Sequence, residues 1–405
     1  MPGSPHLKFN YFAGRKLHLG VCGSVAAFKT LELLRVWKTL GINVSVTLTA
    51  AAREFVTPLS YLSLGASKVY GEMLDGDDVF AHLEPGRLAD AMAILPATAS
   101  AVSRLAAGDA SEMLSAQALA CDRPKLIAPA MHPRMWLNPA TQANCKLLRE
   151  RGFHVVEPAF GRTACGEEGQ GRLADIREIY LATLRMLAPA DLAGRTLLIT
   201  AGPTREFWDG VRFVSNPSSG LMGAALAVAA WLRGAEVKAV CGPGTPWLPA
   251  GIERINVESA AEMLAACQNF WPSCSLGCFT AAVCDYRPLE QGAEKLKKEW
   301  LGDSPVLRLT NNPDIAAALG RLKTEAQHSI VFAAETSNIR QNAIKKLASK
   351  NADMVVANMV GKPGVGFESE SNQVTIIRKN GEATELPMSG KADVAWRIWD
   401  VFLNP

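Results

Sequence analysis

The sequence lacks the features that mark secreted, membrane-spanning and nucleic-acid-binding proteins. No apolar run reaches roughly 18 residues without a charge or a helix breaker, and residues 1–15 contain no apolar signal-peptide segment. The 42 Lys and Arg residues against 39 Asp and Glu leave a formal charge of +3, which gives no basic field to attract nucleic acid or anionic lipid. We expect a cytoplasmic protein with no nucleic-acid partner and no membrane partner.

Cysteine is also sparse, because nine residues are spread over 405 positions without the regular spacing of a disulfide framework. The closest pair, Cys274 and Cys278, has no second pair to complete a zinc site. We therefore predict free thiols, most of them buried in apolar cores, in a reducing compartment. The sequence identifies no set of metal ligands.

Two segments follow the pattern of a βαβ unit, in which an apolar strand, a helix and a second apolar strand alternate. The expected order in the first unit is strand 17–21, helix 25–40 and strand 43–48. In the second unit it is strand 196–200, a long polar loop, helix 219–232 and strand 236–240. Further buried strands are predicted at 91–95, 125–128, 278–282, 329–332 and 354–357. The pattern predicts an α/β protein with two Rossmann-like domains and parallel sheets.

A domain boundary is predicted near residue 190. The chain is longer than one hydrophobic core usually supports, and residues 187–194 form a short segment of small residues with Pro189 and Gly194. The expected domains are therefore residues 1–190 and 191–405.

Two common nucleotide-binding motifs are missing. No G-x-G-x-x-G follows either opening strand, and no G-x-x-x-x-G-K-[ST] occurs anywhere in the chain. Their absence disfavours a dinucleotide site and a Walker-type ATP site. It also weakens an alternative function, that of a nicotinamide-dependent oxidoreductase on paired Rossmann-like domains.

Small polar residues follow the strands of the first half. Gly23-Ser24, Thr49 and Thr98 each come directly after a predicted strand. Because the carboxyl ends of parallel strands meet at one edge of a sheet, these residues could hold a phosphate group together with helix N-terminal amides. The alternative is that they are ordinary helix caps, which favour the same residue types.

Two residues of the first half have side chains suited to proton transfer. His82 lies in a predicted loop, where a lone histidine is more often a structural or surface residue than a catalyst. Cys165 is followed by three glycines within six residues and then by Arg172. Such a segment is typical of a mobile loop that closes over a ligand, and a thiol on it could donate a proton.

These motifs, over residues 15–185, resemble the flavin-dependent cysteine decarboxylases, specifically the phosphopantothenoylcysteine decarboxylase domain. The resemblance implies bound FMN, with Gly23, Ser24, Thr49 and Thr98 near its phosphate or ring. It also implies that Cys165 donates a proton to the ene-thiolate formed by oxidative decarboxylation, and that His82 is the active-site base. Active-site residues would come from several subunits.

Two positions depart from the pattern of that family. His132 stands where the family has an asparagine that orients the substrate, and Ser111-Glu112 replaces Asn-Asp. A neutral imidazole carries one N–H donor and one acceptor, so we expect His132 to take over the role of the amide at the active site. The alternative is a ligase whose flavoprotein half is a catalytically silent scaffold.

The second half contains a polar, glycine-rich loop of about twenty residues between its first strand and helix. Arg205 and Arg212 could bind phosphate or carboxylate, and Ser218, Ser219 and Gly220 precede a helix N-terminus that offers free amides. Further along, Asp285 follows a buried strand and Lys295 lies in a lysine cluster, although such clusters are usually solvated surface.

Together these motifs, over residues 191–400, resemble phosphopantothenate–cysteine ligase, and the two halves stand in the order of the bacterial bifunctional enzyme. The resemblance implies a CTP-dependent ligase with Mg²⁺, whose substrates are 4'-phosphopantothenate, cysteine and CTP and whose intermediate is an acyl-cytidylate. It suggests a homo-oligomer of decarboxylase trimers in a larger shell, with paired ligase domains. Arg212 and Asn216 match positions that handle the intermediate. The nucleotide site would comprise Phe279, Thr280, Ala281, Asp285, Lys295, Pro313, Asp314, Ile315, Ala316, Phe332, Lys346 and Lys350.

Overall fold

The chain forms two units in the computed structural model, which describes residues 3–73, 79–297, 299, 302–335, 339–359 and 369–404. Unit 1 consists mainly of Phe9–Pro189, and unit 2 consists of Ser4–Lys8 and Ala190–Pro405. The short segment Ser4–Lys8 was expected in the first domain. It belongs to unit 2 because Leu7 is buried there and the His6 ring lies 2.9 Å from the carbonyl oxygen of Trp247.

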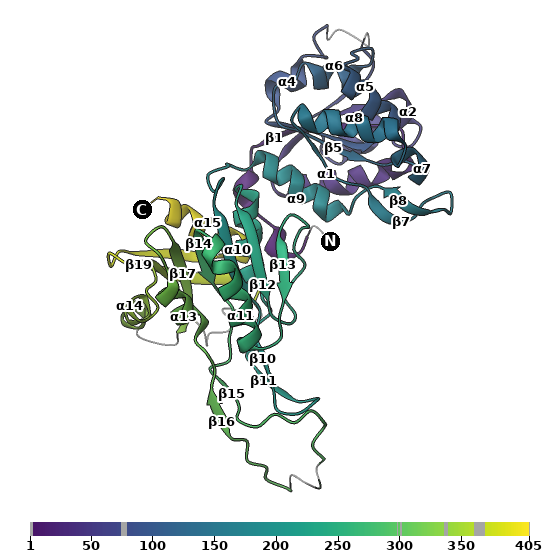
Figure 1. Cartoon of the computed structure of the whole chain (residues 1–405). Coiled ribbons are helices and arrows are strands. Elements are labelled where there is room, and N and C mark those ends of the chain that lie inside the picture. Colours follow the sequence, from purple (N-terminus) through teal and green to yellow (C-terminus); the bar gives the residue numbers. More distant parts are fainter. Residues whose placement is uncertain are drawn as a thin grey trace. The chain divides into compact units, whose positions relative to one another are not determined.

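Unit 1 is a parallel sheet of six strands in the order β3-β2-β1-β4-β5-β6, with helices on its faces (Figure 1). In chain order the strands are β1 (Lys16–Val21), β2 (Asn43–Leu48), β3 (Lys68–Tyr70), β4 (Ala91–Ala97), β5 (Lys125–Pro129) and β6 (Phe153–Val155). The helices are α1 (Lys29–Thr39), α2 (Ala50–Arg53), α3 (Pro58–Ser63), α4 (Glu84–Leu88), α5 (Ala99–Ala107), α6 (Met113–Leu119), α7 (Pro133–Trp136), α8 (Pro139–Glu150) and α9 (Ile176–Leu187). A separate hairpin follows β6 and consists of β7 (Ala159–Arg162) and β8 (Glu168–Arg172).

The central strands of unit 1 are buried along almost their whole length. Every residue of β4 is buried, as expected for a parallel strand that helices cover on both faces. Helix α1 turns Leu33, Leu34 and Trp37 toward this sheet. It begins at Lys29 rather than at the predicted residue 25, because residues 25–28 form a 3₁₀ turn that Ser24 caps.

Unit 2 is a mixed sheet of eight strands in the order β13-β12-β9-β14-β17-β18-β19-β20. Its strands are β9 (Thr196–Ala201), β12 (Glu236–Cys241), β13 (Glu253–Asn256), β14 (Leu276–Phe279), β17 (His328–Glu335), β18 (Met354–Met359), β19 (Ser371–Arg378) and β20 (Ala383–Gly390). Its helices are α10 (Leu221–Leu232), α11 (Ala260–Phe270), α13 (Ile315–Leu322), α14 (Ile339–Ser349) and α15 (Lys391–Leu403). The predicted parallel pairing holds from β13 to β18, whereas β19 and β20 run antiparallel.

The loops at the carboxyl ends of β9 and β14 are more ordered than the sequence suggested. The predicted polar loop after β9 contains a hairpin of β10 (Arg205–Phe207) and β11 (Phe213–Ser215). A second pair, β15 (Tyr286–Pro288) and β16 (Leu309–Asn311), follows β14, which ends at Phe279 rather than at residue 282. Figure 1 shows both pairs extending away from the main sheet of unit 2.

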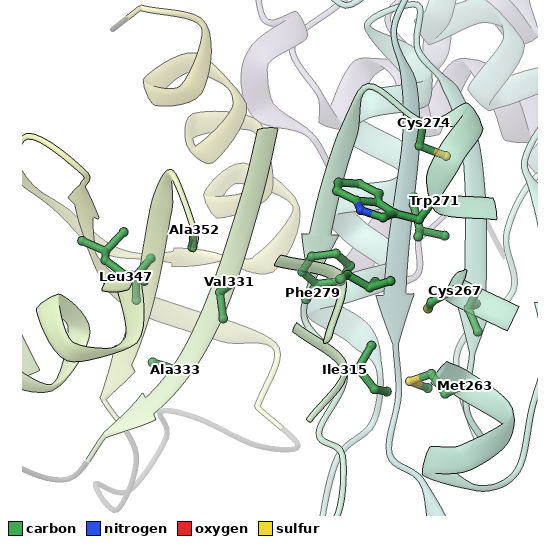
Figure 2. Close-up of a cluster of buried hydrophobic side chains, with 14 of the residues drawn as sticks. Met263, Cys267, Trp271, Cys274, Phe279, Ile315, Val331, Ala333, Leu347 and Ala352 are labelled. Carbon is green, nitrogen blue, oxygen red and sulfur yellow. The ribbon is translucent and has the colours of Figure 1, made fainter. Parts of the chain in front are cut away.

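Buried side chains of β14 and the flanking helices form much of the core of unit 2. Phe279 packs edge-on against Trp271, with ring centroids 6.0 Å apart, and Ile315 of α13 belongs to the same cluster (Figure 2). All nine cysteines are free, and eight of them are buried, as the sequence predicted. Cys165 is the exposed one. Among the described residues, no helix is long and apolar enough to cross a membrane.

Unit 1 also contains a buried polar network centred on His18 of β1. The His18 ring lies 2.9 Å from the Ser45 hydroxyl and 3.2 Å from the Gln117 amide oxygen, which also accepts a hydrogen bond from Thr47. The Gln117 amide nitrogen donates to the carbonyl oxygen of Ala81 over 3.0 Å. Burial lowers the pKa of His18 to about 4, although the contact with Gln117 opposes this shift.

We predict that His18 makes unit 1 less stable in mild acid. The folded pKa lies below the ordinary value near 6.5, so the unfolded chain binds a proton that the folded chain excludes, and stability falls as the pH drops below about 6.5. Between pH 7 and 5 the loss is roughly 2 kcal/mol. Urea unfolding of wild type and His18→Leu at both pH values measures it. A difference between the two proteins that does not change with pH would contradict the prediction.

Candidate active sites

Three hydroxyl side chains stand at the carboxyl edge of the unit 1 sheet, each at the N-terminus of a helical segment. Ser24, Thr49 and Thr98 follow β1, β2 and β4, and each accepts a hydrogen bond of 3.2 to 3.3 Å from a backbone N–H two or three residues on. They are helix caps, as the simpler interpretation held. Capping uses only the oxygen lone pairs, and no described residue accepts a hydrogen bond from these hydroxyls, so their O–H groups can bind a phosphate oxygen.

Gly23 lets α2 pack closely at the same edge, because a Cβ atom at residue 23 would overlap the side chain of Ala51. Beside it lies a cavity of about 460 Å³, which is large enough for a cofactor-sized ligand. Ser24 and Lys29 line this cavity together with His132, Cys165 and Arg172. The fold therefore brings one predicted phosphate ligand, Ser24, to the same cavity as Cys165 and His132.

Cys165 lies in the turn of the β7–β8 hairpin, where the sequence predicted a mobile loop. Residues 159–172 are called the Cys165 hairpin below. The Thr163 hydroxyl is 3.0 Å from the Cys165 sulfur. This contact and the backbone N–H of Glu167 hold the pKa of the exposed thiol below its usual value, while the Glu167 carboxylate opposes the shift. The thiol is thus a readier proton donor than a buried one.

Two residues that depart from the family pattern, His132 and Glu112, form contacts with other side chains or with the backbone. His132 is the N-cap of α7, since its Nδ1 accepts a hydrogen bond of 3.2 Å from the backbone of Arg134. Its Nε2 lies 3.2 Å from the Glu167 carboxylate. Glu112 forms an ion pair with Arg104, so this replacement joins α5 to the start of α6.

His82 is not among the described residues that line the cavity beside Cys165. It lies half-buried in the turn before α4. The carbonyl oxygen of its neighbour Ala81 accepts a hydrogen bond from Gln117, which belongs to the buried network of His18. Within one chain, therefore, His82 and Cys165 do not share this cavity.

The second site surrounds the N-terminus of α10 in unit 2. A cavity of about 120 Å³ is lined there by Gly220, Thr280, Ala281 and Phe332. Gly220, the N-cap of α10, provides no side-chain cap. The backbone N–H groups of the first helical turn could therefore bind an anion. Residues that sequence analysis did not identify also line this cavity, namely Asn358, Asn372 and Lys391.

Two predicted nucleotide residues have side chains that belong to the core. Phe279 and Ile315 are 6% and 4% exposed and pack in the cluster shown in Figure 2. Ala316 packs against the same cluster, and Pro313 is half-buried just before α13. Of Phe279 and Ile315, only the backbone could contact a ligand.

Three charged residues of the predicted nucleotide site lie close together, namely Asp285, Asp314 and Lys350. Asp314 caps α13 through a hydrogen bond of 3.0 Å from Ala317 and forms an ion pair with Lys350. Burial lowers the pKa of Lys350, while the negative charge of nearby Asp285 opposes the shift. Lys346 lies one turn before Lys350 and so on the same side of α14. Lys350 thus lies close to two carboxylates, those of Asp314 and Asp285.

Asp209 joins the two projecting loops of unit 2. Its Oδ1 accepts hydrogen bonds from the backbone of Val211 and Arg212 at 2.8 and 2.7 Å. Its Oδ2 accepts from the Arg212 side chain and from the Leu296 backbone, both at 3.1 Å. Burial alone would raise the pKa of Asp209, but these N–H donors outweigh it and the pKa is lowered. The predicted residue Lys295 is therefore held near Arg212.

Asn216 links the same loop to the end of β14. Its amide nitrogen donates to the carbonyl oxygens of Ala282 and Val283 over 3.2 and 3.0 Å, and its side-chain oxygen takes no part in these two bonds. Among the described residues, no group of three or more His, Cys, Asp or Glu side chains is arranged to hold a metal ion.

Comparison with known proteins identifies two families along the chain. Residues 11–187 match the family described as Flavoprotein, and residues 192–404 match the DNA/pantothenate metabolism flavoprotein C-terminal domain. Relatives named Coenzyme A biosynthesis bifunctional protein CoaBC include one from Vibrio cholerae, 40% identical over 95% of this chain and 96% of its own. The relative from Escherichia coli K12 is 39% identical over 94% of each chain. A solved C-terminal domain of CoaBC is 40% identical, covers 53% of this chain and 97% of its own, and has a TM-score of 0.45.

We predict that Asp209→Ala releases the segment that carries Lys295. The variant removes the carboxylate that accepts hydrogen bonds from the Leu296 amide and from the backbone of Val211 and Arg212, so local opening becomes easier. Limited trypsin digestion should then cleave the native protein faster after Lys295. Asp209→Asn keeps one oxygen for the 209–212 turn and should give an intermediate rate. Equal cleavage of wild type and Asp209→Ala would mean that other contacts hold this segment.

Proposed function

The chain belongs to the family of bifunctional coenzyme A biosynthesis proteins, and we propose that unit 2 joins 4'-phosphopantothenate to cysteine while unit 1 decarboxylates the product. It is a flavoprotein with decarboxylase and ligase activities in coenzyme A biosynthesis. The observation that carries the proposal is the match to both domains, in order, along 95% of the chain. The steps below are assigned from the residues at each site.

In unit 1, FMN is the proposed cofactor. The hydroxyls of Ser24, Thr49 and Thr98 and the helix amides behind them would bind its phosphate, and the lack of a side chain at Gly23 lets Ala51 of α2 pack against this edge. When bound, FMN would accept two electrons from the substrate's thiol carbon, which makes loss of the carboxylate easy, and would return them to the resulting ene-thiolate. The thiol of Cys165 would donate the proton that completes this reduction.

His82 is the proposed base of this reaction, but within one chain it does not line the Cys165 cavity. A second copy of the chain would have to supply it, which agrees with an active site shared between subunits. We therefore include a homo-oligomer in the proposal, with decarboxylase trimers and paired ligase domains as the expected arrangement.

In unit 2, the proposed reaction uses CTP to activate the carboxylate of phosphopantothenate. A carboxylate is a poor electrophile, so it first becomes an acyl-cytidylate, which the amine of cysteine then attacks. Lys346 and Lys350 would neutralise phosphate charge, and Arg212, Asn216 and Lys295 would bind the reacting phosphate and acyl groups. The small cavity at the α10 N-terminus fits an anionic part of the ligands.

We propose that Mg²⁺ binds together with the nucleotide, not at a site formed by protein ligands alone. The described residues offer no cluster of three metal ligands, and Mg²⁺ commonly binds through one or two carboxylates plus substrate phosphates. Asp285 and Asp314 are carboxylates of the proposed nucleotide site that could bind Mg²⁺.

We predict that Cys165→Ser separates the steps of decarboxylation. Serine is a far weaker acid than a thiol, so release of 4'-phosphopantetheine should fall by roughly 100-fold or more, while FMN binding and ligation persist. Product analysis with supplied phosphopantothenoylcysteine measures the loss, and the visible spectrum verifies that flavin is still bound. Release at the wild-type rate would remove Cys165 from the mechanism. If wild type itself only accumulates phosphopantothenoylcysteine, the flavoprotein half is a silent scaffold.

We predict that Lys295→Ala impairs ligation alone. Loss of one charged hydrogen bond to the bound nucleotide should lower kcat/KM for CTP by roughly 10- to 100-fold. Decarboxylation of supplied phosphopantothenoylcysteine should stay unchanged, because Lys295 belongs to unit 2. Lys297→Ala, two residues along the same exposed segment, is the matched control. An equal loss in both lysine variants, or a loss of both activities, would contradict this assignment.

A further inference from the structure

The turn of the Cys165 hairpin is fixed by its own hydrogen bonds. The backbone N–H and the hydroxyl of Thr163 both donate to the carbonyl oxygen of Glu167, each over 2.8 Å. Gly166 has a φ of 90°, which favours glycine, and its N–H donates to Thr163 over 3.0 Å. These contacts tie both ends of the turn together, so Cys165 and Glu167 have a defined relation to each other.

The base of the hairpin is attached to the segment that precedes α7. The Met131 amide donates to the carbonyl oxygen of Gly171 over 2.9 Å. A Cβ atom on Gly169 would lie 2.8 Å from the Pro133 ring, and one on Gly171 would overlap the Met131 carbonyl oxygen. Strand β8 can lie against residues 131–133 only because these two positions are glycine. The base is therefore held whether or not the turn makes any contact.

The turn itself contacts this segment through the Glu167 side chain. One carboxylate oxygen lies 3.2 Å from His132 Nε2, and the other lies 3.7 Å from the Arg134 guanidinium. Because His132 Nδ1 accepts the Arg134 backbone N–H, the neutral ring carries its proton on Nε2 and donates it to Glu167. Both ring nitrogens are thus engaged by protein groups.

We propose that the Glu167–His132 contact holds the Cys165 thiol at the cavity, and that His132 is a positioning residue rather than the group that orients the substrate. The nitrogen that could replace an asparagine amide at the substrate is bonded to Glu167 instead. Cys165 and His132 line the same cavity in this arrangement, so the contact keeps the proton donor where the substrate must bind. The proposal rests on the proposed decarboxylase function of unit 1.

The neighbouring residue Glu168 provides a matched control. It lies on the same hairpin, is exposed, and forms no side-chain hydrogen bond or ion pair within the described part of the chain. Glu167→Gln and Glu168→Gln therefore remove the same charge from adjacent positions. Only the first removes the carboxylate that His132 and Arg134 contact.

The first measurement is the alkylation rate of Cys165, the one exposed thiol, in the full-length protein without substrate. It is taken on the high-pH plateau, where the thiol is fully ionised and changes in its pKa no longer affect the rate. Glu167→Gln and His132→Ala should each react roughly two- to fivefold faster than wild type, the factor expected for an exposed ion pair. Glu168→Gln should match wild type. Equal rates in all four proteins would overturn the proposal.

The second measurement is the kinetics of decarboxylation of supplied phosphopantothenoylcysteine by the same proteins. Glu167→Gln and His132→Ala should lower kcat and leave KM unchanged, and the double variant should be no slower than either single one, because both remove one contact. A raised KM in His132→Ala with unchanged alkylation would show instead that His132 orients the substrate. If wild type does not decarboxylate at all, the proposed function fails, and the alkylation rates still decide whether the contact exists.

Discussion

The geometry of parallel strands determines where both candidate active sites lie. Each parallel strand must return through a crossover, so the carboxyl end of a strand is followed by a helix N-terminus at the same edge of the sheet. In unit 1 this places the Ser24, Thr49 and Thr98 caps in one row, and in unit 2 it places the uncapped start of α10 beside the end of β14. The two units use this constraint differently, with hydroxyl caps in the first and lysine–carboxylate pairs in the second.

Most of the parallel core was predictable because a buried parallel strand is a short apolar run, and β4 and β5 are such runs. The antiparallel strands β19 and β20 were not identified. Their exposed and buried residues alternate, and Asn380-Gly381 lies in the turn between them, with Gly381 at a φ of 85°. That dipeptide is a hairpin signal that the sequence offered. Missing this hairpin also meant missing Asn372 and Lys391, which it brings to the unit 2 cavity.

Residue roles were less predictable than residue positions. Asp209 lies in the polar loop between β9 and α10, yet its role depends on the Leu296 amide, 87 residues away in sequence, which no local pattern reveals. His132 was expected to act on the substrate because it stands where the family has an asparagine that orients the substrate. Its hydrogen bonds depend on Glu167, and only the fold brings the Cys165 hairpin against α7. Phe279 lay in a nucleotide motif, but its ring fills the core of unit 2.

The strength of the contacts that hold the Cys165 hairpin decides which part of the hairpin can move. Its base depends on close backbone packing at Gly169 and Gly171, where no side chain must be displaced or reordered. Its turn depends on Glu167, whose side chain is 46% exposed and whose pairing with Arg134 is long and solvated. Exposed pairs of this kind contribute about 1 kcal/mol or less. The turn can therefore open while the base stays fixed, which is what entry of a substrate into a cavity beside the thiol requires.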